Sequence, residues 1–327
     1  MWTLALALSL LTPAAPCTDA EAAAMPGSWT QVEDDLAMAD PTFPKASYPL
    51  LFKKTDRVID LLKKAIPDPP GIEARVYRTV RGRSYLKDGA LMFGVNALFL
   101  GYYCVEDTPS YPKIRGTIQK GGETETWIYI DFNSMSWLGS DSMKLGEGFN
   151  SPKGGRFHFV PKVGGEIAGL PIYLPDVHKN DRTEAVIISS RSPYKPVSKE
   201  MFLKARLMQL EPQLVKAAGA PKYRAELEAQ QAALAKALDG LSPEEKQEQA
   251  IVRGPYETKK IFATEAEGGR KIATISGSLF DGQGSRDVIR TIVVYWRWDP
   301  KEPAKAAMIE RFKKALDFAA LKALLGK

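Results

Sequence analysis

Three stretches of contrasting composition limit the folds that are open to this chain of 327 residues. Residues 72–190 and 261–298 contain short alternating apolar and polar runs separated by Gly, Pro and Asn/Asp turns, which is typical of β-strands. Between them, residues 197–252 are almost free of glycine and aromatic residues and carry leucines at helical spacing. We therefore predict an α+β fold, a largely antiparallel sheet with a helical insertion at about 197–252.

Local signals place the helices. A helix is expected over residues 49–66, where apolar positions recur at helical spacing. In the insertion, Ser198 can cap a helix that Pro212 is expected to end or bend, and a second helix follows over residues 222–239. Ser242 begins the sequence Ser-Pro-Glu-Glu, a capping box that predicts a third helix.

Strands are expected where apolar runs are bounded by turn residues. The uncharged run 90–105 is interrupted by glycines and is interpreted as two buried strand segments. The other strand segments before the insertion are residues 72–80, 123–132, 156–160, 166–173 and 184–189.

The C-terminal part is expected to return to the sheet. Residues 271–280 and 287–298 are predicted to form a strand hairpin, and a helix follows over residues 303–316. Residues 258–327 would then complete the same domain as a helix-plus-β core in residues 47–196.

The N-terminus predicts export. Residues 2–11 are uncharged and mostly apolar, which is too short for a bilayer-spanning helix but typical of a secretory signal peptide. We assign residues 1–17 to that signal peptide and residues 18–46 to a flexible leader. The expected location is outside the cell or in the periplasm or cell envelope, and the protein is not expected to be transmembrane.

The chain has two cysteines, Cys17 and Cys104. If Cys17 is removed with the signal peptide, Cys104 is a free buried thiol. If Cys17 is retained, the two can form a disulfide in an oxidising compartment. Lipid attachment at Cys17 is a further alternative, although Ala14 and Pro16 depart from the usual lipidation pattern.

The net charge, the histidine content and the missing motifs exclude several classes of function. The net charge of +6 is spread along the chain without a basic stripe, so no nucleic-acid partner is expected. The two histidines, His158 and His178, exclude a three-histidine metal site within one chain. There is no G-x-S-x-G nucleophile elbow, P-loop or strand–GxGxxG–helix, and we predict no metal and no cofactor.

One strand carries the only candidate site residues. The polar face of residues 123–132 presents carboxylates at the spacing of a glycosidase pair, beside aromatic side chains that could stack on sugar rings. The candidate catalytic residues are Glu123, Glu125 and Asp131, and the candidate ligand-binding residues are Trp127, Tyr129, Asn133 and Trp137.

Two functions remain open. The first is a secreted or cell-envelope, non-catalytic binding or assembly protein of unknown ligand, with a protein partner bound through helices in residues 198–252. The alternative is a secreted, carboxylate-dependent glycan hydrolase, for which a glycan is the ligand. An enzyme would need its carboxylates in a concave pocket, whereas a binding protein would not.

Overall fold

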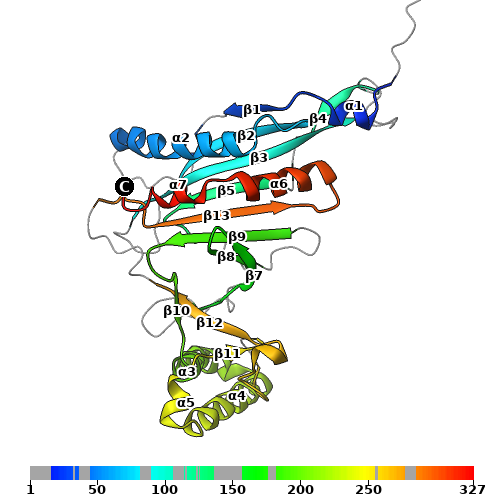
Figure 1. Cartoon of the computed structure of the whole chain (residues 1–327). Helices are drawn as coiled ribbons and strands as arrows, with labels where there is room; N and C mark the ends of the chain where they lie inside the picture. The colour runs from blue at the N-terminus through cyan, green and yellow to red at the C-terminus, as the bar shows by residue number, and fades with distance from the viewer. Residues whose placement is uncertain are drawn as a thin grey trace, which may run out of the picture.

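The computed structural model describes residues 16–31, 34–36, 45–81, 90–105, 114, 116–122, 124, 126–135, 157–175, 182–254, 257–276 and 285–327. The fold is α+β, as predicted, with a mostly antiparallel sheet and helices. A large sheet with helices on one face forms the upper body, and a small sheet carrying helices lies beyond one of its edges (Figure 1).

The large sheet has nine strands, and all of its pairings but one are antiparallel. The exception is β1, which runs parallel to β2. The strand order is β1 (Ser28–Gln31), β2 (Ile72–Arg81), β3 (Met92–Cys104), β5 (Trp127–Phe132), β13 (Thr291–Trp298), β9 (Arg182–Ser189), β8 (Leu170–Leu174) and β7 (Lys162–Ile167), with β4 (Ile118–Lys120) paired to β3.

Helices α2 (Tyr48–Ala65), α6 (Pro303–Ala315) and α7 (Phe318–Lys322) supply apolar side chains to the main core on one face of this sheet. The ring of Trp296 on β13 packs edge-on against Phe312 of α6, with 5.6 Å between the ring centroids. The indole N–H of Trp296 donates to Glu184 of β9, and Lys313 of α6 forms an ion pair with the same carboxylate. These contacts fix α6 over the centre of the sheet.

A second sheet contains β10 (Tyr194–Pro196), β12 (Arg270–Ile275), β11 (Ile251–Val252) and β6 (Phe157–Phe159). It carries α3 (Lys199–Lys216), α4 (Pro221–Asp239) and α5 (Pro243–Gln247), which we call the helical arm. Leucines of α3 and α4 share a separate core with Phe157 and Phe159 of β6. Short helical segments complete the structure: α1 (Asp19–Ala23), η1 (Lys45–Ser47), η2 (Ala217–Gly219) and η3 (Glu265–Glu267).

The predicted C-terminal hairpin is wrong. Strand β12 pairs with β6, β10 and β11, whereas β13 pairs with β5 and β9 in the other sheet. All eight residues of β13 are buried. A strand that is covered on both faces belongs in the middle of a sheet, which requires a partner on each side rather than one hairpin partner.

Three other expectations need correction. The run 90–105 forms one strand, β3, rather than two segments. The expected strand 166–173 is instead the hairpin β7–β8, because Ala168 and Gly169 both adopt positive φ and make a two-residue turn. Pro212 does not end α3, which continues to Lys216. The helix starts at Ser198 and Ser242 are confirmed, and Ser242 forms the predicted capping box with Glu245.

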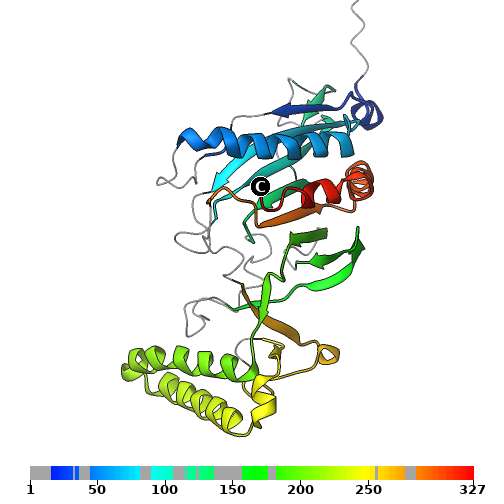
Figure 2. The same cartoon turned by 60° about the vertical axis from the view of Figure 1, so that its left-hand side comes forward.

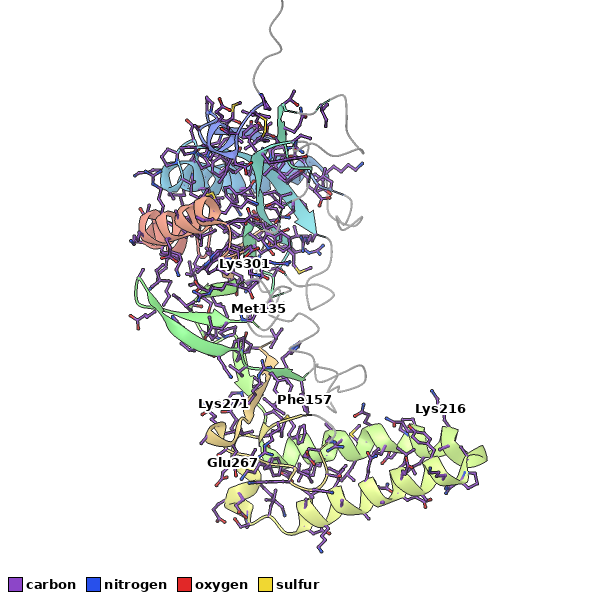
Figure 3. All side chains as sticks on the ribbon, turned by 90° about the vertical axis from the view of Figure 1, so that its right-hand side faces the viewer. Met135, Phe157, Lys216, Glu267, Lys271 and Lys301 are labelled. Atoms are coloured by element: carbon purple, nitrogen blue, oxygen red, sulfur yellow. A yellow bond between two sulfur atoms is a disulfide. The ribbon has the colours of Figure 1, made fainter. Side chains whose placement is uncertain are left out.

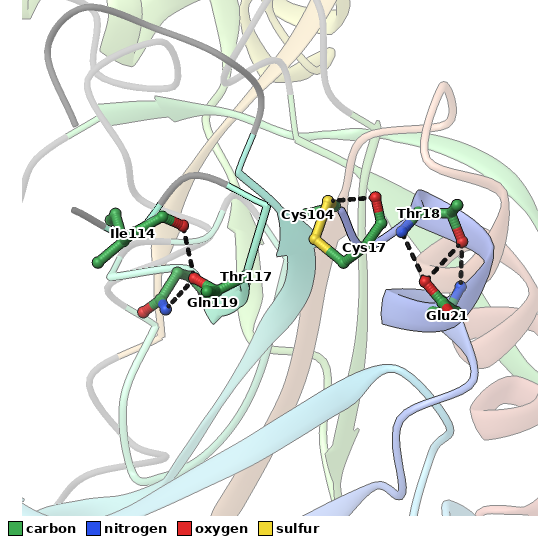
Figure 4. The surroundings of a disulfide bond; sticks show 7 residues. All are labelled: Cys17, Thr18, Glu21, Cys104, Ile114, Thr117 and Gln119. Carbon is green, nitrogen blue, oxygen red and sulfur yellow. Dashed lines mark hydrogen bonds between the residues drawn. A yellow bond between two sulfur atoms is a disulfide. The ribbon is translucent and has the colours of Figure 1, made fainter. Parts of the chain in front are cut away.

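Part of the expected flexible leader is docked on the sheet. Strand β1 pairs with β2, and the indole N–H of Trp29 donates to the carbonyl of Ile66 at the end of α2. A disulfide joins Cys17 to Cys104 at the end of β3, and Thr18 and Glu21 form a capping box beside it (Figure 4). Residues 16–31 are therefore part of the folded body.

We predict that replacing both Cys17 and Cys104 with serine lowers the free energy of unfolding by about 2–4 kcal/mol, because the crosslink closes a long loop. The two cysteines are 87 residues apart in sequence. Urea denaturation followed by circular dichroism measures the loss, and a reducing agent should shift the wild-type curve to the position of the variant. An unchanged wild-type curve under reducing conditions would contradict the stabilising role.

Candidate binding surfaces

The first candidate surface is the sheet face away from α2 and α6, which carries the residues singled out by sequence. Trp127, Tyr129 and Asp131 alternate with the core residues of β5 and so lie on this face. Tyr129 pairs with Asn96 of β3 on one side and with Tyr295 of β13 on the other. The predicted alternation of β5 is thus confirmed for residues 127–132.

The aromatic side chains on this face stack on one another. The rings of Trp127 and Tyr129 are nearly parallel with centroids 5.6 Å apart, and Tyr295 lies 6.3 Å from Tyr129. The guanidinium carbon of Arg297 lies 4.6 Å from the centre of the Trp127 ring. The ring faces that a sugar would use are therefore engaged by contacts within the protein.

Asp131 is buried, with 2% of its surface exposed. Its side chain lies against Gly94 of the neighbouring strand, where a Cβ would come within 2.7 Å of Oδ1. A general acid must reach a glycosidic oxygen, so this burial gives the hydrolase alternative no support. Glu123, Glu125 and Trp137 lie outside the described residues, so the geometry of the proposed carboxylate pair is not described.

Burial also determines the protonation state of the Tyr129 hydroxyl. Desolvation, followed by the nearby Asp131 carboxylate, raises the pKa of the Tyr129 hydroxyl to about 12, against the opposing effect of Arg81 and Arg297. A neutral, buried phenol cannot act as a base near neutral pH.

Asn133 has a structural role in this geometry. It is fully buried and adopts a left-handed backbone conformation with φ of 55°. Its side-chain amide donates to the carbonyls of Leu91 and Val288, and its carbonyl accepts from the backbone N–H groups of Arg290 and Thr291. These four bonds join β5 to the segments before β3 and β13 and leave no donor for a ligand.

The second candidate surface is the helical arm, which projects sideways from the small sheet (Figures 2 and 3). Inside it, Leu203 and Leu210 of α3 and Leu227 and Leu234 of α4 are buried. Met208 and Val215 lie off this leucine stripe on the outer side of α3, and they are 48% and 77% exposed. Tyr223, at the start of α4, is 49% exposed.

The sequence analysis does not single out Met208, Val215 or Tyr223. The spacing of Met208 and Val215 is a signal for this surface, because the two residues are seven apart and share a helix face that the leucines do not occupy.

Comparison of the chain with protein-family models, with curated proteins and with solved structures gave no match. Within the described ranges, no three His, Cys, Asp or Glu residues are grouped so that they could hold a metal ion. In the same part of the chain, no helix has the length and apolar character needed to cross a membrane.

We predict that Asn133→Asp lowers the free energy of unfolding by about 3 kcal/mol or more, because a carboxylate would face two carbonyl oxygens in place of the amide donor. Thermal denaturation measures the effect. Asn133→Ala and Asn96→Ala form the matched pair, since Asn133 loses four hydrogen bonds whereas the buried Oδ1 of Asn96 accepts none from the described residues. Equal losses in both variants would contradict a special role for Asn133.

Tyr129 provides a test at high pH. Its pKa in the folded protein lies above the unfolded value of about 10, so the stabilisation is complete below about pH 10 and is lost as pH rises towards 12. We expect wild type to lose about 2–3 kcal/mol more than Tyr129→Phe across that interval. Urea denaturation at a series of pH values measures both proteins, and parallel curves would contradict the burial of the phenol.

Proposed function

We propose that the protein is a secreted or cell-envelope, non-catalytic binding protein that contacts its partner through the helical arm. The observation that carries this proposal is the placement of Met208, Val215 and Tyr223, large apolar side chains that a projecting pair of helices exposes to solvent. Exposed apolar side chains on a protruding element support an interaction surface at that element.

The arm is built as a separate unit, which supports a role in contact rather than in stabilising the main sheet. Its core is formed by its own leucines and by the small sheet. Lys199 at the start of α3 forms an ion pair with Glu248, just after α5, and the backbone N–H of Lys199 donates to the carbonyl of Glu248. These bonds hold the base of the arm while leaving its far end clear.

The disulfide supports the export part of the proposal, because structural disulfides persist in oxidising compartments. It also requires that a signal peptide be removed before Cys17, after Ala14 or Ala15, and not at the expected boundary of residue 17. A Cys17 sulfur bonded to Cys104 cannot carry a thioether-linked lipid. The mature protein would therefore keep Cys17 and lack an N-terminal lipid on it.

The proposal predicts that the outer half of the arm is dispensable for folding but necessary for binding. Replacing residues 212–225 with a short Gly-Ser linker keeps the layer of Leu210 and Leu227 and removes Val215 and Tyr223. We expect cooperative unfolding with a melting temperature within a few degrees of wild type. Cross-linking mass spectrometry in the native compartment should show intermolecular links at Lys204 and Lys236 in wild type and their loss in the shortened protein.

The matched control is Val163→Ser on β7, which removes a side chain that is 59% exposed but far from the arm. Its cross-links should equal those of wild type. Unchanged cross-links in the shortened protein would refute the arm as the contact element, and loss of cooperative unfolding would refute its independence from the sheet.

A further inference from the structure

The free end of the arm combines exposure with small residues. The segment η2 joins α3 to α4, and every residue from Ala218 to Glu226 is exposed. Lys216 marks this end in Figure 3, at the point of the arm farthest from the sheets. Residues 217–221 (Ala-Ala-Gly-Ala-Pro) have small side chains, so the backbone of this connection can come close to another surface. We call residues 212–225 the arm tip.

The arm tip carries positive charge without any negative charge. It contains Lys216, Lys222 and Arg224, and no acidic residue occurs between Glu211 and Glu226. At the base of the arm, residues 239–248 contain four acidic residues and one lysine, and the start of α3 adds Lys199, Lys204, Arg206 and Glu200. Positions 199–248 contain eight basic and eight acidic residues, so the three basic residues of the arm tip are offset by a net negative charge over the rest of the arm.

The backbone at the start of α4 adds partial positive charge to the arm tip. Helix α4 begins at the arm tip with Pro221 in its first turn and has no side-chain cap. The N–H groups of its first turn thus face outward, where the helix dipole places partial positive charge. Arg224 is held by an exposed ion pair with Glu228 one turn further along α4, so Lys216 and Lys222 are the main cations offered to a partner.

Apolar side chains lie among these charges. Val215, the neighbour of Lys216, has the largest exposed fraction of any large apolar residue in the described part of the chain. Tyr223 follows Lys222 and has an apolar ring with a polar hydroxyl, a combination that suits the boundary between lipid and water. A protruding end with cations, an aromatic ring and an aliphatic side chain matches an anionic lipid surface.

We propose that the arm tip docks on an anionic lipid bilayer, with Lys216 and Lys222 at the headgroups and Val215 and Tyr223 inserted at the interface. This inference rests on the proposed function and adds a second contact to it, because the arm tip meets lipid while the sides of the arm near Lys204 and Lys236 meet the partner. Helix α4 has 19 residues and spans about 28 Å, so docking at the tip holds the sheets away from the membrane.

The experiment is flotation of the full chain with phosphatidylglycerol-containing vesicles and with vesicles of phosphatidylcholine alone. We expect stronger binding to the anionic vesicles than to phosphatidylcholine alone, and a smaller difference as the Debye length falls from about 10 Å to about 3 Å between ~0.1 M and ~1 M salt. Lys216→Gln with Lys222→Gln should lower the partition coefficient about 25-fold, about fivefold for each charge. Val215→Ser with Tyr223→Ser should also weaken binding, and the salt dependence should remain.

A matched control variant, Lys162→Gln with Val163→Ser on β7, removes one exposed lysine and one exposed valine away from the arm and should bind like wild type. Residues 1–15 are identical in all proteins, so membrane affinity from that segment would be the same in each. A second readout is Tyr223→Trp, whose fluorescence should shift to the blue with anionic vesicles and not with inorganic phosphate.

Equal binding by wild type and both tip variants would overturn the lipid assignment, as would absence of binding to anionic vesicles. If vesicle binding fails while cross-links from Lys216 or Lys222 reach a protein, the arm remains the contact element and only the lipid assignment falls. If the shortened arm keeps its native cross-links, the proposed function itself fails.

Discussion

Strand β13 is the element on which the rest of the structure depends. All of its residues are buried, and it joins β5 on one side to β9 on the other. Its first residue, Thr291, pairs with Ser189, the last residue of β9. The chain therefore leaves the large sheet and returns to it at neighbouring positions, so that residues 190–290, which supply the small sheet except for β6, form an insertion with adjacent ends. That geometry lets a small sheet and a helical arm be added without interrupting the main core.

Sequence patterns predicted the elements whose structure depends on residues nearby in the sequence. The alternation of β5, the capping box at Ser242 and the helix start at Ser198 all have the expected structure, because each is set by residues within one or two turns. The pairing of β12 and β13 is long-range, and the glycine-containing loop between them favoured a hairpin on local grounds alone. The better signal was the sequence of β13 itself, since the run from Ile292 to Trp298 is apolar or aromatic apart from Arg297, too apolar for a strand with one exposed face.

The candidate site residues show a second limit of prediction from sequence. Trp127, Tyr129 and Asp131 lie on the predicted face of β5, but polarity in the sequence was taken as a sign of exposure, and Tyr129 and Asp131 are buried. Asn133 was chosen as a ligand-binding residue because of its position beyond the strand, whereas its amide joins three segments that are distant in sequence. A buried asparagine and a ligand-binding asparagine have the same sequence signature, because both need hydrogen bonds that local spacing does not reveal.

The disulfide and the arm together limit how this protein could be held at a membrane. With the Cys17 sulfur bonded to Cys104, a lipid cannot be attached at that atom. A surface contact of the kind proposed needs apolar side chains beside cations on a part of the molecule that protrudes. The arm tip meets all three requirements, and it lies at the end of the molecule opposite α1 and the disulfide (Figure 1). Docking there would leave the aromatic sheet face and the N-terminal segment free of the bilayer.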